Sequence, residues 1–211
     1  VLMTDLLMTE TYRRLPQQIT YRGPWQQTST GHGFLLADPR PEEVRLDDLA
    51  FSLSRQTRYN GHMSEDVEHY SIAQHEVLIS RWMEEDGLSP EACYAGLHHD
   101  TPEGYYGDFI SQVKYCVPEL RSFAAKIDTV VFEALGVTGR PGFKEIVKVY
   151  DLIALSTEQR DLMAPNLTEF SWGDLPTPRK TVIKPWSAWR ARTAFLERHY
   201  QLISRVSGAI T

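Results

Sequence analysis

Cysteine is scarce in this sequence of 211 residues, which contains only Cys93 and Cys116. The two do not form a Cys-x-x-Cys motif and are too few for a disulfide framework, so we expect a reduced, cytoplasmic setting. Long apolar runs are missing as well, since no segment approaches the roughly 20 residues that a membrane-spanning helix needs. The opening VLMTDLLMTE lacks the basic start of a secretory signal, and we interpret it as a tail.

An excess of positive charge is also missing. Asp and Glu number 28 against 22 Lys and Arg, which gives a net charge of -6 and a pI near 5.7. A general nucleic-acid-binding protein would show a basic face, so we do not expect one here, although a small anionic substrate fits if cations gather locally. The chain has no Walker-type glycine loop and no Gly-x-Ser-x-Gly elbow, which disfavours P-loop and serine-hydrolase chemistry.

Helical periodicity is what the sequence has in quantity. Helical patterning covers residues 42–55, 67–85, 90–100, 119–135, 143–163 and 187–207. Residues 1–42 are punctuated by proline and glycine, so we expect an irregular N-terminal segment with at most short strands near residues 19–21 and 33–36. The sequence therefore predicts an all-α fold, a compact helical bundle in one domain over residues 43–211 that a C-terminal helix closes.

The stretch with the densest chemistry is residues 92–114, ACYAGLHHDTPEGYYGDFISQVK. His99 and Asp100 are adjacent there, and side chains of different length at neighbouring positions can converge on one cation. Divalent transition ions accept such mixed nitrogen and oxygen ligands. Glu103 follows His99 by four residues, which would place it on the same helical face one turn on. A histidine and an aspartate rarely saturate such an ion, so we expect further ligands on neighbouring helices.

Two further ligand candidates come from other helical segments. His69 lies in EHYSIAQH and Asp151 lies inside the apolar run VYDLIAL. Burying an unpaired carboxylate is costly, so Asp151 is either a ligand or is paired with an arginine or a loop cap. His75 is a poorer candidate, because six residues after His69 it would point about 120° away on the helix and be packed or solvated. For the remaining histidines we expect a core or supporting role at His98, and surface or loop positions at His32, His62 and His199.

These segments resemble the HD-domain phosphohydrolases. The order His69, then His99 and Asp100, then Asp151 is similar to the H…HD…D pattern of that superfamily, over roughly residues 43–163. The segments EHYSIAQH, LHHDTPEGYYGD and YDLIALSTEQRDLM resemble the branch of bacterial 5′-deoxynucleotidases and phage or prophage nucleotide phosphohydrolases, which includes the phage dATP triphosphohydrolases. The resemblance implies an α-helical fold, one catalytic divalent cation, and hydrolysis of a phosphate ester or anhydride.

The resemblance also implies roles for the matched residues. The positions that fall on its metal ligands are His69, His99, Asp100 and Asp151. Glu103 falls on the acidic residue that activates or positions the attacking water, and Asp108 on an acidic residue that assists proton transfer or holds the sugar. Such a water becomes a nucleophile near neutral pH when a bound cation lowers its pKa, and a carboxylate can take its proton.

Two cationic residues and one aromatic residue complete the matched set. Lys114 and Arg58 fall on phosphate-binding positions, where a lysine acts as a point charge and an arginine as a bidentate fork. Tyr59 departs from the bacterial nucleotidases, which carry tryptophan after this arginine, and the spacing from Arg58 to His69 is shorter than theirs. We expect Arg58, Tyr59 and Lys114 to bind substrate, the alternative being a solvated surface for the two cations.

Together these features predict a divalent-metal-dependent phosphohydrolase of deoxynucleotides. The expected cofactor is one divalent transition-metal ion (Co, Mn, Zn, Ni or Fe), and an additional Mg on the substrate phosphates is compatible with it. A dATP or dNTP triphosphohydrolase is favoured, because the opening DPRPEEVRLDDLA through RYNGH resembles the phage branch. The alternatives are a 5′-deoxynucleotidase acting on monophosphates and a non-catalytic nucleotide-binding regulator, which would show a damaged ligand set. We further expect a homo-oligomer without membrane or nucleic-acid partners.

Overall fold

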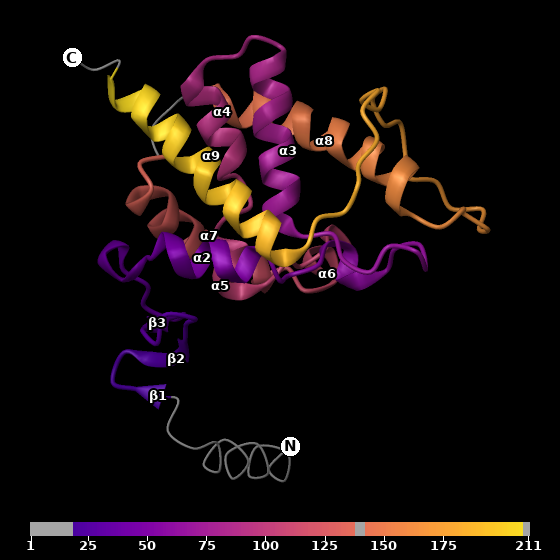
Figure 1. The fold of residues 1–211 in the computed structure, drawn as a ribbon. Coiled ribbons are helices and arrows are strands. Elements are labelled where there is room, and N and C mark those ends of the chain that lie inside the picture. The colour runs from indigo at the N-terminus through magenta and orange to yellow at the C-terminus, as the bar shows by residue number, and fades with distance from the viewer. Residues whose placement is uncertain (1–18, 138–141, 209–211) are drawn as a thin grey trace, which may run out of the picture.

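The structure, a computed structural model, describes residues 19–137 and 142–208 (Figure 1). Most of this part of the chain is helical, so the predicted all-α fold is confirmed. The helices are α2 (Leu46–Leu53), α3 (Ile72–Glu85), α4 (Pro90–Leu97), α5 (Glu103–Tyr106), α6 (Ser111–Cys116), α7 (Glu119–Ala134), α8 (Phe143–Leu162) and α9 (Ala188–Gly208), with two short 3-10 turns, η1 (Pro41–Glu43) and η2 (Arg58–Gly61).

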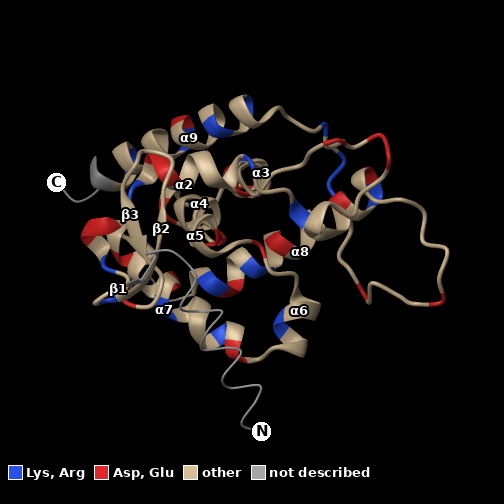
Figure 2. Cartoon of the chain, turned by 90° about the horizontal axis from the view of Figure 1, so that it is seen from below, with Lys and Arg blue, Asp and Glu red and all other residues tan. Residues whose placement is uncertain are grey.

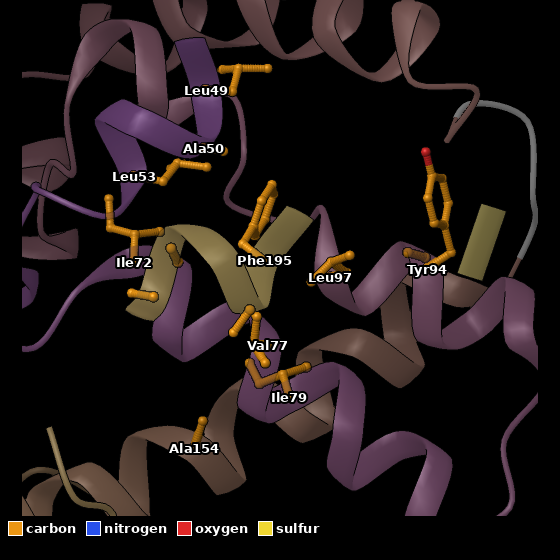
Figure 3. Close-up of a cluster of buried hydrophobic side chains, with 14 of the residues drawn as sticks. Leu49, Ala50, Leu53, Ile72, Val77, Ile79, Tyr94, Leu97, Ala154 and Phe195 are labelled. Carbon is orange, nitrogen blue, oxygen red and sulfur yellow. The ribbon is translucent and has the colours of Figure 1, made fainter. Parts of the chain in front are cut away.

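Helices α3, α4 and α9 form the centre of the fold. α3 and α4 lie side by side, and both α9 and α8 pack against the two of them (Figure 1). The facing side chains are apolar and fully buried, including Ile79, Leu97 and Phe195 (Figure 3). Gly96 permits the close approach of α3 and α4, because a Cβ at this position would overlap Met83 Sδ and lie 3.3 Å from Ile79 Cγ2. The packing therefore sets how near the start of α3 comes to the end of α4.

A small sheet precedes the helices, and its first and third strands lie where short strands were predicted, near residues 19–21 and 33–36, whereas the strand between them was not predicted. Strands β1 (Ile19–Thr20), β2 (Gly23–Gln27) and β3 (Gly33–Leu35) form an antiparallel sheet in the order β1-β2-β3. Prolines and glycines suggested irregular structure, but they serve short turns, and Gly23 adopts φ 110 directly after the first turn. Phe34 stacks on Tyr105 with ring centroids 3.7 Å apart, which fixes the sheet against α5. Residues 1–18 lie outside the described residues.

Two helix boundaries differ from the prediction, and both affect the candidate site. The helix predicted over residues 67–85 begins at Ile72, because the Ser71 hydroxyl accepts a hydrogen bond from Gln74 N and caps it. The helix predicted over residues 90–100 ends at Leu97, so residues 98–100 lie in a turn. The short helices α5 and α6 were not predicted, since Gly104 indicated a break. The other long helices begin and end close to the predicted positions.

Charge is mixed along the helices that surround this core. Lys and Arg alternate with Asp and Glu along α7 and α8 (Figure 2). This distribution agrees with the acidic net charge and gives these two helices no face of one sign. Among the helices of the described residues, none combines the length and the apolar character needed to cross a membrane.

Candidate metal centre

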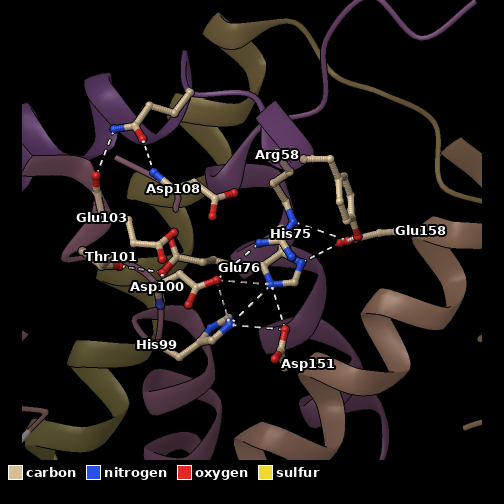
Figure 4. A network of polar contacts seen from close by, with 12 residues as sticks. Arg58, His75, Glu76, His99, Asp100, Thr101, Glu103, Asp108, Asp151 and Glu158 are labelled. Carbon is tan, nitrogen blue, oxygen red and sulfur yellow. Dashed lines mark hydrogen bonds and ion pairs between the residues drawn. The ribbon is translucent and has the colours of Figure 1, made fainter. Parts of the chain in front are cut away.

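Three helices bring four potential metal ligands together (Figure 4). His75 lies in the first turn of α3, His99 and Asp100 directly follow α4, and Asp151 projects from α8. One ligand atom each from His75, His99 and Asp151 lies within 4.8 Å of the others. Asp100 Oδ2 borders both imidazoles, 3.7 Å from His75 Nε2 and 3.3 Å from His99 Nε2. The predicted residues His99, Asp100 and Asp151 are therefore brought together.

Two of the three separations match those of ligands around one small ion, and the third is slightly longer. The Nε2 atoms of His75 and His99 are 3.3 Å apart, and Asp151 Oδ1 lies 3.5 Å and 4.0 Å from them. Ligands placed tetrahedrally about 2.0–2.2 Å from a transition ion lie about 3.3–3.6 Å from one another. The residues present thus fit a divalent transition ion that accepts imidazole nitrogen and carboxylate oxygen together.

Hydrogen bonds determine which nitrogen of each imidazole faces the cluster. His75 Nδ1 donates to Glu158 Oε1 at 2.6 Å, and His99 Nδ1 donates to the Gly96 carbonyl at 2.9 Å. Neutral rings with protonated Nδ1 atoms carry lone pairs on both Nε2 atoms. Two lone pairs 3.3 Å apart repel each other unless a proton or a metal ion shares them. The arrangement is therefore suited to a cation.

The charges around the imidazoles of His75 and His99 also favour a cation at this position. Burial and Arg58 lower the pKa of His75, but Glu158 and Asp151 outweigh them and raise it to about 9. Burial opposes ionisation of Asp151, yet the neighbouring His75 and His99 hold its pKa well below its usual range. The same rings, together with Arg58, overcome the effect of burial and lower the pKa of Asp100. The cluster thus keeps two anionic carboxylates beside two imidazoles.

His69 is not part of this cluster, and the ligand prediction for it is corrected. Its Nε2 donates to the Ser54 carbonyl at 2.8 Å instead. Because α3 begins at Ile72, His69 lies in the non-helical segment before the helix, and the 120° argument between positions 69 and 75 does not apply. His75, which was expected to be packed or solvated, is fully buried and faces His99.

The predicted substrate residues Arg58 and Tyr59 reach the cluster from the η2 turn. Arg58 Nη1 lies 3.3 Å from Asp100 Oδ2, so a guanidinium stands beside a ligand carboxylate. The Tyr59 hydroxyl donates to the buried Glu158. Tyr59 and Asn60 both have a left-handed backbone, with φ 58 and 53, which is costly for residues other than glycine. A strained turn next to a charged cluster is a feature that functional sites often show.

Glu103 and Asp108, the predicted catalytic residues, lie on the side of Asp100 that is away from His99 and Asp151 (Figure 4). Glu103 begins α5, so it follows a turn and not a continued helix, and Lys114 Nζ from α6 donates to its Oε1 at 3.0 Å. Burial and the charges of Asp100 and Asp108 raise the pKa of Glu103 well above its usual range, against the influence of Lys114. Glu103 Oε2 is buried and has no hydrogen-bond partner among the described residues. Burial also raises the pKa of Asp108.

The other two buried histidines, His98 and His199, form a separate pair outside the cluster. His98 Nδ1 donates to Thr101 Oγ1 at 3.1 Å, and His98 Nε2 accepts from His199 Nδ1 at 3.0 Å. This agrees with the core or supporting role expected for His98. His199 was expected at the surface, but only 8% of it is exposed, because this face of α9 packs on α4. The exposed histidines are His32 and His62, as predicted.

Two residues of the site were not predicted from the sequence: His75, which belongs to the cluster, and Glu158, which accepts its hydrogen bond. The signal for His75 was the capping serine at position 71, which moves the start of the helix past His69. The signal for Glu158 was its spacing from Asp151: seven residues are close to two helical turns, so both lie on one face of α8. A glutamate on the same face as a candidate ligand is a natural hydrogen-bond partner for a ligand histidine.

Comparisons with known proteins place the chain beside two relatives. No family model matches the sequence. It is 35% identical over 136 residues to the uncharacterized protein YfdR of Escherichia coli (strain K12), a match that covers 64% of this chain and 71% of the relative. It is 27% identical over 194 residues to the uncharacterized protein RCAP_rcc00048 of Rhodobacter capsulatus, covering 87% of this chain and 98% of the relative. The extent of the first match shows that the chain belongs to the same protein family as YfdR.

Proposed function

We propose that the protein is a divalent-metal-dependent phosphohydrolase that acts on nucleotides. The observation that carries the proposal is the meeting of His75, His99 and Asp151 within 4.8 Å, with the guanidinium of Arg58 beside the adjoining Asp100. A metal ion and an arginine at one site are the parts that hydrolysis of a phosphate ester or anhydride requires. The resemblance of the surrounding segments to HD-domain phosphohydrolases supports the same reaction.

Each residue has a task that its surroundings allow. A bound ion would lower the pKa of a water and neutralise charge on a phosphoryl oxygen. Arg58 and Lys114 would hold the substrate's phosphate oxygens, Arg58 through its guanidinium fork and Lys114 as a point charge. Glu103 would orient the water and accept its proton, since its Oε2 has no hydrogen-bond partner among the described residues and its raised pKa makes it a stronger base than an ordinary carboxylate.

Lys114 would connect phosphate binding with proton transfer, because it also contacts Glu103. In the structure its ammonium pairs with Glu103 Oε1 at 3.0 Å, and the lysine side chain is partly exposed. An arriving phosphate would compete for this ammonium and loosen its hold on Glu103. The carboxylate would then be a stronger base, because Lys114 is the neighbour that lowers its pKa. Substrate binding would thus raise the proton affinity of the group that must take the proton.

The favoured substrates are deoxynucleoside triphosphates, and deoxynucleoside monophosphates are the alternative. Cleavage at the 5′ oxygen yields a nucleoside in both cases, but a triphosphate substrate yields an inorganic triphosphate and a monophosphate substrate yields inorganic phosphate. The preference for triphosphates comes from the resemblance of residues 38–62 to the phage branch. Measuring the nucleoside and the phosphate product together distinguishes the two.

A product screen tests the proposal. The purified protein is incubated with ribo- and deoxynucleoside mono-, di- and triphosphates in the presence of Mn²⁺, Co²⁺, Ni²⁺, Zn²⁺ or Fe²⁺, and products are separated by chromatography. We expect nucleoside release that a chelator abolishes. His75→Ala should be inactive, and His69→Ala, which alters a histidine outside the cluster, should retain activity. A protein that binds one ion stoichiometrically but releases no nucleoside or phosphate from any of these substrates would contradict the proposal.

A further inference from the structure

Glu158 is a fully buried carboxylate at the junction of the ligand cluster and the η2 turn (Figure 4). Its Oε1 accepts hydrogen bonds from His75 Nδ1 at 2.6 Å and from the Tyr70 hydroxyl at 2.9 Å. Its Oε2 accepts one from the Tyr59 hydroxyl and lies 3.4 Å from Arg58 Nε. Each oxygen therefore serves a different neighbour: Oε1 faces the metal ligand, and Oε2 faces the arginine.

Burial of this carboxylate has a cost that its partners must offset. An isolated ionised carboxyl group in a protein interior is strongly disfavoured, whereas one with several hydrogen bonds and a nearby cation is tolerated. Glu158 has three donors and a guanidinium within 3.4 Å. A hydrophobic residue at this position of α8 would pack without such requirements. The carboxylate therefore has a role that packing alone does not explain.

The contact with His75 decides how that ring can act. Because Nδ1 donates to Glu158, the lone pair of the neutral ring is on Nε2, the atom that lies 3.3 Å from His99 Nε2. A carboxylate on the far nitrogen of a ligand histidine fixes the ring's orientation and increases its basicity. Without Glu158 the ring could adopt the other tautomer, in which Nε2 carries a proton and cannot bind a metal ion.

The contacts on Oε2 act on the turn that carries Arg58. Tyr59 and Asn60 hold left-handed backbone angles, so the turn needs interactions that compensate for its strain. The hydrogen bond from the Tyr59 hydroxyl to Glu158 is one of these, and the edge of the Tyr59 ring meets Trp172 at a centroid distance of 6.2 Å. The same oxygen attracts Arg58 Nε and so limits where the guanidinium can lie.

We propose that Glu158 is a positioning residue that orients His75 for metal binding through one oxygen and Arg58 for phosphate binding through the other. The metal part of this inference rests on geometry alone, and the phosphate part rests on the proposed function. One carboxylate then couples the two halves of the site, so that an ion at His75 and a phosphate at Arg58 depend on the same side chain.

Binding measurements on the metal-free and metal-loaded protein test the inference without relying on turnover. Dissociation constants for Mn²⁺ and Co²⁺ are measured by titration calorimetry on metal-free protein, and the dissociation constant for inorganic phosphate on metal-loaded protein. Glu158→Gln keeps the size of the side chain but removes its charge. We expect it to weaken ion binding by about 10–100-fold, the usual effect of losing such a partner of a ligand histidine. Phosphate binding should also weaken.

Two control variants separate positioning from general destabilisation. Glu145→Gln makes the same chemical change at an exposed position of α8. Tyr94→Phe removes a buried hydrogen bond from the Tyr94 hydroxyl to the Leu135 carbonyl, 2.8 Å long, away from the cluster. Both controls should bind ions and phosphate as the parent does. Parental ion affinity in Glu158→Gln would overturn the proposal, and parental phosphate affinity would overturn its Arg58 half.

Single-hydroxyl variants decide the question if Glu158→Gln does not fold. Tyr59→Phe removes the hydroxyl that holds Oε2 and should weaken phosphate binding more than ion binding, whereas Tyr70→Phe removes one of the two donors that hold Oε1 and should weaken ion binding more. Parental affinities in both variants would overturn the proposal. A protein that hydrolyses no nucleotide would refute the proposed function but leave the ion measurements decisive, and an active protein with unchanged ion affinity in Glu158→Gln would refute only this inference.

Discussion

His98 and His99 are neighbours in the chain, but their imidazoles belong to two different histidine pairs. His99 faces His75 with Nε2 atoms 3.3 Å apart, and His98 faces His199 at 3.0 Å. Both pairs are largely buried. The end of α4 at Leu97 separates them, because the turn that follows sends one ring toward α3 and α8 and the other toward α9. Two similar contacts thus arise in two different surroundings.

The surroundings shift the pKa of His75 and the pKa values of the His98 and His199 pair in opposite directions. Carboxylates of Glu158 and Asp151 contact His75 and raise its pKa to about 9 despite burial. No carboxylate contacts either ring of the other pair among the described residues, so burial lowers the pKa of His199 to about 4 and that of His98 well below its usual value. The surroundings of the first pair thus favour a positive charge, and those of the second disfavour one. Proximity of two imidazoles therefore does not make a metal site, and the carboxylates around them decide.

The largest expected effect comes from removing a member of the carboxylate-lined pair. His75→Ala should abolish stoichiometric binding of a transition ion and lower nucleotide hydrolysis by about 10³-fold or more, since a metal-bound water is lost with the ion. His69→Ala should leave both unchanged, because His69 Nε2 bonds to the Ser54 carbonyl outside the cluster. Elemental analysis beside kcat checks both variants. Loss of the ion in His69→Ala with retention in His75→Ala would reverse the assignment.

A second effect should separate ligands from the catalytic acid or base within the same surroundings. Glu103→Gln should keep the ion, because Glu103 contacts Lys114 and none of the imidazoles. Turnover should fall by about 10²–10⁴-fold, the range for loss of a group that transfers a proton. Asp100→Asn is the matched comparison, and its ion content and kcat should fall together. The role assigned to Glu103 fails if Glu103→Gln loses its ion or turns over at the parental rate.

The pair without carboxylates should matter for stability and not for ion binding. His199→Ala removes the donor to His98 Nε2 and leaves a buried acceptor unsatisfied, at a cost of about 1–3 kcal/mol. Ion stoichiometry at 25 °C should stay at the parental value, because the ring lies outside the cluster. Chemical denaturation and elemental analysis measure the two quantities. An ion-free but fully stable variant would show that the two pairs are not independent.

The smallest expected effect is a pH dependence of opposite sign for the two pairs. An unfolded histidine titrates near pH 6.5. His199 has a folded pKa of about 4, so its contribution to stability is present above pH 6.5 and is lost as the pH falls toward 4. His75 has a folded pKa of about 9, so its contribution in metal-free protein is present below pH 6.5 and is lost as the pH rises toward 9.

Thermal unfolding of metal-free protein from pH 4.5 to 9 measures these slopes. We expect His199→Gln to flatten the slope between pH 4.5 and 6.5 only, and added metal ion to alter the slope between pH 6.5 and 9 only. Carboxylates also contribute to the acid slope of both proteins, so the difference between His199→Gln and the parent reports the histidine. Flattening of the alkaline slope by His199→Gln would contradict the division into two pairs.

Most of the helical fold could be predicted from the spacing of apolar residues, and the sequence also indicated much of the candidate site. The long helices were predictable from apolar spacing, and the cluster residues His99, Asp100 and Asp151 from the order and spacing of three segments that resemble the HD-domain phosphohydrolases. His75 was missed because the choice between it and His69 depended on where a helix begins, and the Ser71 cap decides that. Strand β2 and the role of Glu158 depend on contacts between distant segments, the pairing of β2 with β3 and the hydrogen bond from His75, which no local pattern shows.

The absence of a side chain at Gly96 has a consequence for which ions the site admits. Its carbonyl accepts the hydrogen bond from His99 Nδ1, and its missing Cβ lets α3 and α4 come together. The spacing of the two imidazoles is therefore set in part by Gly96, a residue that has no side chain and is not itself a candidate ligand. A methyl group at this position would push α3 and α4 apart and increase the distance between the imidazoles of His75 and His99. Discrimination between ions of different radius at the proposed metal site would then depend on helix packing as well as on donor chemistry.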